Sequence, residues 1–196
     1  MADATGTTSV KGAVEQADIA AVETLRPAFE SSPAQALGEL GKLGDEPPLA
    51  MFSAAVLVAG VLAGRSSLWR AGVRMLAAHA VATGLKNLVK NSVDRTRPKL
   101  LDHGEYRMEP GHSKDKRLRS FPSGHAAGVS AVARAASREL RLGPGLSLAA
   151  ASLASMQIVR RMHFPSDVIA GAALGLLAEA IAGRLLQPLL GPARRG

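Results

Sequence analysis

PPLAMFSAAVLVAGVLAG, residues 47–64, is a stretch of 18 residues without a charged side chain. At 1.5 Å per residue, a helix of this length is about 27 Å long, which is close to the hydrocarbon thickness of a bilayer. A second uncharged run covers residues 142–159, and a third apolar stretch, 168–190, is interrupted only by Glu179 and Arg184. These segments predict membrane-spanning helices.

Two further segments, 71–90 and 124–140, predict helices that are rich in Ala and Gly but carry charged or titratable groups: Arg74, His79, Lys86, Arg134 and Arg138. Such groups are expected to face the interior of a bundle or to lie at an interface. Small residues suit close helix packing in lipid, and no strand-like alternation appears. We therefore expect an all-α fold, an integral-membrane bundle of about five spanning helices. A soluble Ala-rich bundle is the alternative.

The 196 residues are enough for one compact domain, and they divide into three parts. Residues 1–48 lack a long apolar run and the features of a secretory signal, so they predict an amphipathic or partly disordered leader. Residues 49–190 are expected to form the helical-bundle domain, and 191–196 a basic tail.

The net charge of +8 is unevenly distributed along the chain. Residues 1–48 hold three basic and eight acidic residues, so they carry −5 and the remainder carries +13. Clustered Lys and Arg favour nucleic acid, an anionic membrane surface or a phosphorylated substrate. Nucleic acid is the least favoured, because Trp69 and Tyr106 are the only residues of their kinds. The absence of Cys excludes disulfides and thiolate metal sites.

A phrase occurs twice in the chain, as SFPSGHAAG at 120–128 and as HFPSDVIAG at 163–171. Ser after Pro and before a helical run is a good N-cap, so Ser123 and Ser166 predict two helix starts. A helix N-terminus attracts anions through its unpaired N–H groups and its dipole. Gly124 has no Cβ to keep an anion away from this backbone.

Each helix start has a histidine beside it, and a pair of cations lies upstream. His125 is in the first turn of one helix, and His163 precedes Asp167 by four residues. A carboxylate near a histidine fixes the tautomer and leaves the other ring nitrogen free to attack. In KNSVDRTRPKL, residues 90–100, Lys90 and Arg97 are cations suited to phosphate oxygens.

Together, K-x6-R-P from Lys90, P-S-G-H ending at His125 and H-x3-D from His163, in this order, resemble the motifs of the type-2 phosphatidic acid phosphatase superfamily. That superfamily includes membrane lipid phosphatases, soluble acid phosphatases and vanadium haloperoxidases. The resemblance covers roughly residues 49–190. It implies a phosphatase that needs neither a metal nor another cofactor.

The resemblance also implies a role for each matching residue. His163 becomes the nucleophile that forms a phosphohistidine, Asp167 orients it, and His125 is the general acid that protonates the leaving oxygen. The phosphoryl oxygens are bound by Lys90, Arg97, Ser123 and the backbone of Gly124, which supplies electrostatic stabilisation.

The sequence departs from the family pattern at one position. The third family motif is S-R-x5-H-x3-D, and counting back from His163 places Gln157 where the family has Arg. Gln157 donates hydrogen bonds without a charge. Arg160 and Arg161 follow three and four residues later, near the same helix face, and are candidates for the missing cation.

The expected function is hydrolysis of a phosphate monoester or diphosphate on a lipid-like substrate, either phosphatidate, phosphatidylglycerol phosphate or a polyprenyl phosphate or diphosphate. The expected location is a bacterial-type inner or plasma membrane. The sequence leaves open the face of the membrane that carries the site, and the oligomeric state. The alternatives are a vanadate-dependent haloperoxidase and a catalytically impaired, anion-binding membrane scaffold.

Overall fold

The computed structural model describes residues 6–190, with side chains from residue 12 onward. The described chain is mainly helical, as predicted. Its α-helices are α1 (Gly6–Phe29), α2 (Ser32–Leu40), α3 (Glu46–Leu62), α4 (Ser66–Lys90), α5 (Gly124–Leu140), α6 (Pro144–Val159) and α7 (Pro165–Leu190). Short 3-10 turns are η1 (Gly41–Gly44), η2 (Pro98–His103) and η3 (Lys116–Leu118).

A small antiparallel ribbon, together with an isolated bridge between Arg95 and Arg119, departs from an all-helical chain within residues 6–190. It pairs β1 (Val93–Arg95) with β2 (Met108–Pro110), and Asp94 lies opposite Glu109. Strands of three residues are too short to give an alternating sequence pattern, so the sequence did not reveal them. The ribbon belongs to the long connection between α4 and α5.

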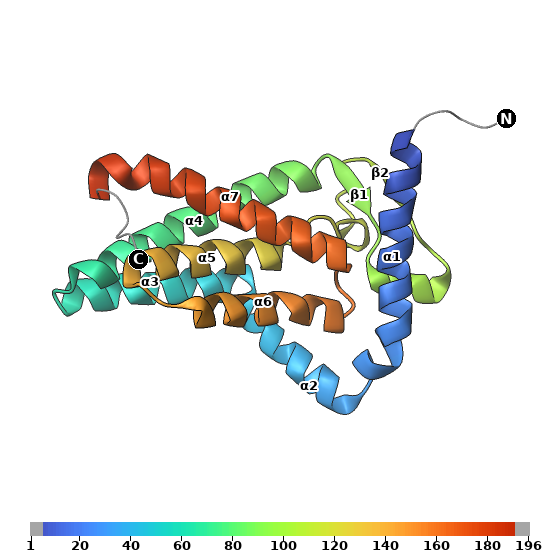
Figure 1. Cartoon of the computed structure of the whole chain (residues 1–196), viewed down its shortest axis with the longest axis horizontal. Helices are drawn as coiled ribbons and strands as arrows, with labels where there is room; N and C mark the ends of the chain where they lie inside the picture. Colours follow the sequence, from blue (N-terminus) through green and yellow to red (C-terminus); the bar gives the residue numbers. More distant parts are fainter. Residues whose placement is uncertain (1–5, 191–196) are drawn as a thin grey trace.

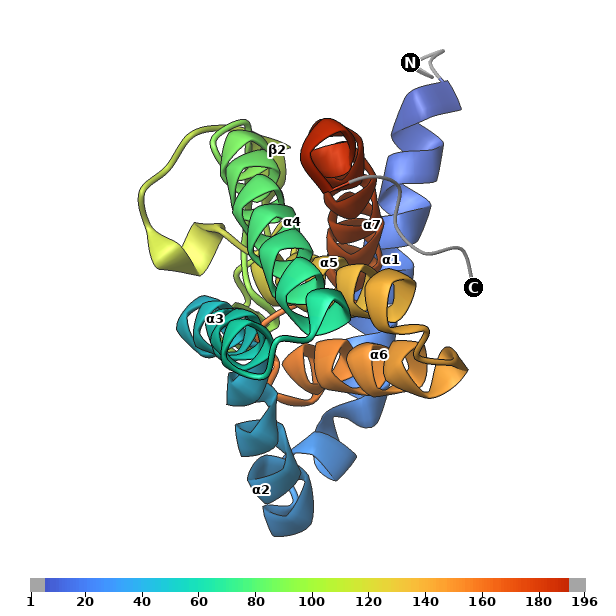
Figure 2. The same ribbon diagram turned by 90° about the vertical axis from the view of Figure 1, so that its left-hand side faces the viewer.

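Helices α3 to α7 form the bundle, and α5 lies at its centre in contact with α4, α6 and α7 (Figures 1 and 2). The N-terminal ends of α5 and α7 lie at the same end of the bundle as the C-terminal end of α4 (Figure 1). At this end α1 crosses the bundle steeply, beside the ribbon. The three sequence motifs are therefore brought to one end of the molecule.

Small residues allow the helices to approach closely. A Cβ added at Gly175 of α7 would collide with the backbone carbonyl of Ala127 on α5, and one added at Gly72 of α4 would collide with the backbone of Leu57 on α3. The buried core between the helices is correspondingly rich in alanine, including Ala71, Ala78, Ala82, Ala127, Ala131, Ala135, Ala178 and Ala182. Close backbone packing positions the ends of α5 and α7 against each other.

The large apolar side chains lie mostly outside this core. Exposed examples on α3, α6 and α7 include Met51, Phe52, Val61, Leu62, Leu148, Ile169, Leu176, Leu185 and Leu189. Within the described residues, α7 is long and apolar enough to span a membrane by itself. The segment Ser32–Gly44 passes the same test only together with α3, from which it is bent by 55°.

The predicted five spanning helices are thus not confirmed. Helices α4 and α5 carry charged side chains, and α3 and α6 have only 17 and 16 residues. The described part of the predicted leader forms α1, α2, η1 and the first three residues of α3, while the predicted basic tail, 191–196, lies outside the described residues.

Candidate active site

The two Phe-Pro-Ser phrases meet at the helix starts. The backbone N–H of Ser123 donates to the carbonyl oxygen of Asp167 over 3.0 Å, and Gly171 of α7 packs against the carbonyl of Ser123. Ser123 is the N-cap of α5, and its hydroxyl accepts a hydrogen bond from the N–H of Ala126. The repeated phrase therefore places two helix N-termini side by side.

Ser166 does not have the predicted capping role. Helix α7 begins at Pro165, so Ser166 lies within its first turn. The carboxylate of Asp167 reaches back instead, and its Oδ2 accepts from the N–H of Phe164 over 2.9 Å. This is the second half of a capping box, in which an acidic residue in the first turn pairs with the N–H before the helix.

His163 and Asp167 are brought together as predicted, and both are buried. Nδ1 of His163 lies 3.7 Å from Oδ2 of Asp167, which is an ion-pair distance but too long for a hydrogen bond. The carboxylate is held by three other donors: Arg95 Nη1 at 2.6 Å, Ser120 Oγ at 2.6 Å and the N–H of Phe164. Asp167 is therefore fixed before it engages the histidine.

The environment of His163 favours the neutral imidazole. Burial lowers the pKa of His163 below its ordinary value, and the positive charges of Lys90 and Arg97 act in the same direction. Asp167 opposes this shift. A neutral ring with Nδ1 facing Asp167 has a lone pair at Nε2, which is the form that a nucleophile needs.

The charges of the two predicted phosphate-binding cations act on this histidine, and Arg97 Nη1 lies 3.6 Å from Sδ of Met162, the residue before it. Lys90, at the end of α4, donates from Nζ to the carbonyl of Arg119 over 2.6 Å. Arg97 donates from Nε to the carbonyl of Lys116 over 2.9 Å. Backbone carbonyls of the connection before α5 thus hold both cations at the edge of the site.

A further lysine, Lys86, contacts the start of α5. It lies one helical turn before Lys90 and is buried, and a Cβ at Gly124 would approach its Cδ to 2.5 Å. Its ammonium group pairs with the carboxylate of Glu46 at the start of α3. The i, i+4 spacing from Lys90 was a sequence signal for this residue, because it places both lysines on one helix face.

His125 occupies a different environment from His163. Its Nδ1 lies 3.3 Å from Oδ1 of Asp45, the residue before α3. Nε2 is buried without a hydrogen-bond partner in the described structure, and Gly44 of η1 packs so closely on the ring that no Cβ would fit. The predicted general acid is thus enclosed by the connection between α2 and α3, which sequence reasoning did not associate with the site.

The structure separates the two candidate replacements for the missing arginine. Helix α6 ends at Val159, so Arg161 does not continue the helix face of Gln157, and its φ of 52° turns the chain away. Arg161 forms ion pairs with Asp102 at 2.5 Å and Glu30 at 3.5 Å. The charge of Arg161 is therefore paired with two carboxylates that are not among the predicted site residues.

Arg160 packs against Gly38 of α2 and Gly41 of η1. Its positive charge acts on both His125 and Arg97, and within residues 12–190 it forms no ion pair. Gln157 is buried beneath η1, with its Nε2 lacking a hydrogen-bond partner in the described chain. Of the two arginines, Arg160 therefore remains the candidate for the missing cation.

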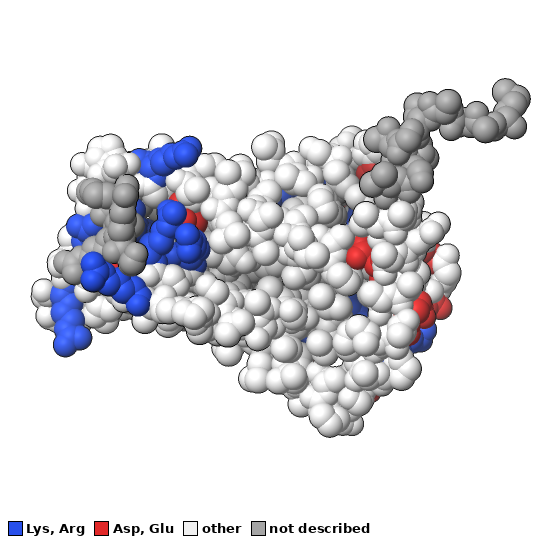
Figure 3. Space-filling view, viewed as in Figure 1, with Lys and Arg blue, Asp and Glu red and all other residues white. Residues whose placement is uncertain are grey.

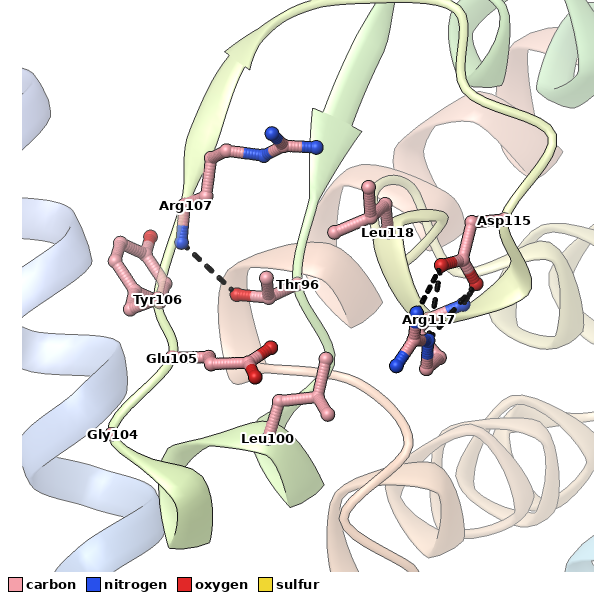
Figure 4. Close-up of a pocket in the computed structure, with 9 residues that line it drawn as sticks. All are labelled: Thr96, Leu100, Gly104, Glu105, Tyr106, Arg107, Asp115, Arg117 and Leu118. Atoms are coloured by element: carbon pink, nitrogen blue, oxygen red, sulfur yellow. Dashed lines mark hydrogen bonds and ion pairs between the residues drawn. The ribbon is translucent and has the colours of Figure 1, made fainter.

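A cavity of about 410 Å³ lies in the same connection, but no predicted site residue lines it (Figure 4). Its lining residues are Thr96, Leu100, Gly104, Glu105, Tyr106, Arg107, Asp115, Arg117 and Leu118. Thr96 stands between Arg95 and Arg97 in sequence, and its hydroxyl accepts from the N–H of Arg107. Among the described residues, no three His, Asp or Glu side chains are grouped as a metal site requires, and metal independence stays a prediction.

Comparison with known proteins decides the family. The model of the PAP2 superfamily matches residues 71–188, which include all three motifs. The chain belongs to the PAP2 superfamily. Lipid A 1-phosphatase of Rhizobium johnstonii is 37% identical over 95 residues, which are 46% of this chain and 38% of that protein. The match therefore spans about two fifths of the relative's length, and no solved structure matches the chain.

Proposed function

We propose that this PAP2 protein hydrolyses a phosphate monoester or diphosphate on a lipid through a phosphohistidine at His163. The observation that carries the proposal is the convergence of His163, Asp167, Lys90, Arg97 and the N-terminus of α5 at one end of the bundle. Sequence order, family membership and geometry all favour the same reaction.

In the first step, Nε2 of His163 attacks phosphorus while the bond to the leaving oxygen breaks. Asp167 stabilises the positive charge that develops on the ring. The cations Lys90 and Arg97 exchange their backbone carbonyl partners for phosphoryl oxygens, which bind charged donors more strongly. The unpaired first-turn N–H groups of α5 supply further donors without a reorganisation cost.

His125 protonates the leaving alkoxide or phosphate in this step. In the second step a water attacks phosphorus and the P–N bond breaks, His125 accepts a proton from that water, and inorganic phosphate leaves with neutral His163 restored. Splitting one displacement into two easier ones is the advantage of the covalent route.

A membrane location is supported by the distribution of side chains. In the bundle, alanine is buried and large aliphatic residues are exposed, which suits lipid-facing helices packed through small residues. On the face of the molecule seen in Figure 3, most Lys and Arg gather at one end, most acidic residues lie at the other, and a wide, largely uncharged surface lies between them. We propose that α3 to α7 lie in a bilayer with this uncharged surface toward lipid.

The substrate class follows from the same placement. A lipid phosphate presents its phosphoryl group at the end of the bundle while its chains remain in the bilayer. The matched relative is named for lipid A, so lipid A joins phosphatidate, phosphatidylglycerol phosphate and polyprenyl phosphates as a candidate substrate.

The test is phosphate release from each of these lipids by the purified protein, with His163→Ala as the background control. We expect release to persist in excess EDTA and to be inhibited by vanadate, which mimics the trigonal-bipyramidal phosphoryl species. Activity that disappears with EDTA and returns with magnesium would rule out this mechanism. Vanadate-dependent oxidation of bromide by peroxide would instead favour a haloperoxidase.

A further inference from the structure

Helix α1 contributes a buried carboxylate to the active-site end of the bundle. Asp18 is only 4% exposed. It accepts from Arg95 Nη2 over 2.7 Å, from the N–H of Ser166 over 3.0 Å and from the hydroxyl of Ser166. Asp18 lies outside residues 71–188, the segment that matches the family, so family membership assigns it no role.

Arg95 connects this carboxylate to the catalytic one. It is 1% exposed, and its Nη1 donates to Asp167 Oδ1 over 2.6 Å while Nη2 donates to Asp18. Its guanidinium carbon lies 4.3 Å from the centroid of the Phe164 ring, so the group is held between an aromatic face and two carboxylates. One cation is therefore shared by two anions.

The charge balance of this cluster bears on His163. Arg95 and Asp167 alone would form a neutral pair, leaving little negative charge to stabilise a positive imidazole ring. With Asp18 included, two carboxylates face one guanidinium, and the cluster has a net charge of −1. We propose that Asp18 is a positioning residue that pairs with one nitrogen of the Arg95 guanidinium, so that Asp167 remains available as an anion to His163 during phosphoryl transfer. The proposal rests on the proposed function.

The alternative is that the network only anchors α1. A buried ion pair is weak evidence for stability, because the cost of removing charges from water offsets much of their attraction. An apolar contact would have anchored the helix without burying three charges. A network that only anchored α1 would not require the direct hydrogen bond from Arg95 to the carboxylate of Asp167.

Other charged or titratable groups also face these residues. Around His163 they are Asp167 on α7, Lys90 on α4 and Arg97 before η2. Around Arg95 they are Asp18, Asp167 and the half-buried Tyr106, with Glu15 of α1 close to Tyr106. Only Asp18 and Asp167 are carboxylates bonded to Arg95 in the described structure.

The test is the pH dependence of kcat/KM for Asp18→Asn. Removing a negative charge lowers the pKa of His163, so its neutral form persists to lower pH and the acid limb moves to lower pH. At the same time kcat falls by about 2- to 30-fold, because the positive transition state loses stabilisation. A purely structural defect would lower activity without moving the limb.

Three variants serve as controls. Glu23→Gln removes a carboxylate of the same helix that pairs only at the surface with Arg26, and it should leave the profile unchanged. Asp18→Glu and Ser166→Ala both keep the charge of the cluster, so both should keep the acid limb of the parent. If Asp18→Asn does not fold, Asp18→Ser, which removes the same charge with a smaller side chain, carries the test with the same expected displacement of the acid limb.

An unmoved acid limb in folded Asp18→Asn would overturn the inference. So would a limb displaced in Ser166→Ala or in Asp18→Glu. Failure of the proposed function has a different signature, because the parent's activity would then survive His163→Ala.

Discussion

His163 and His125 each stand next to a carboxylate, but the two pairs are built differently. Asp167 is fully buried and held by donors from β1, the α4–α5 connection and its own helix start. The Asp45 side chain is 49% exposed and reaches His125 from the start of α3. A nucleophile must be held in one geometry, whereas a general acid must exchange protons with solvent. The difference in burial lies in the carboxylates, because the two histidines are equally buried, and the exposed Asp45 is the group that connects His125 to solvent.

Loss of the general acid gives the largest effect among the variants that probe this contrast. His125→Ala should lower kcat about a hundred- to ten-thousandfold on an alkyl phosphate, because its leaving oxygen needs a proton. The same variant should lose much less on an aryl phosphate such as p-nitrophenyl phosphate. The measurement is the ratio of kcat values on the two substrates. Equal losses on both would remove His125 from the acid role.

The arginines after α6 test the cation that accompanies both histidines. Arg160→Ala should lower kcat about ten- to a hundredfold, since a charge-assisted bond to the phosphoryl group is lost. Arg161→Ala, the matched control, should reduce the melting temperature through its pairs with Asp102 and Glu30 but change kcat little.

Gln157→Arg completes that series. It should gain little if Arg160 already supplies the charge, because a second cation would compete for the same oxygens. A gain of about tenfold or more, with Arg160→Ala neutral, would show that the site lacks one charge. An inactive parent that no substitution rescues would favour the scaffold alternative.

The smallest effect is expected at the exposed partner of His125. Asp45→Asn should lower kcat on the alkyl phosphate by no more than about fivefold, because a half-exposed ion pair contributes little. Glu39→Gln, which removes an exposed partner of Lys42 nearby in the chain, is the matched control. A loss as large as that of His125→Ala would mean that the exposed Asp45 is as important to His125 as the buried Asp167 is to His163.

Local patterns in the sequence predicted the helices of the bundle, the Ser123 cap and the motifs that meet at one end. The family resemblance supplied the roles of His163, Asp167 and His125. Such features are readable because each depends on residues within one turn or one motif. The capping of α7 by Asp167 rather than Ser166 was missed because the helix begins at Pro165, two residues before the start that an N-cap at Ser166 implies.

Local sequence patterns could not identify the residues of the N-terminal segment that contact the site. Asp18 contacts Arg95 across 77 positions of sequence, and Asp45 contacts His125 across 80. No periodicity or spacing encodes contacts at such distances. The choice between Arg160 and Arg161 likewise depended on where α6 ends, since a helix face stops predicting neighbours once the helix is over.

The central claim is tested most directly by trapping the covalent intermediate. The protein is mixed with a lipid phosphate labelled in its phosphoryl group, quenched with alkali, digested and mapped. We expect a label that is stable to alkali, labile to acid and located at His163, and we expect none in His163→Ala. A label located on a different residue, or turnover in His163→Ala equal to that of the parent, would contradict the account.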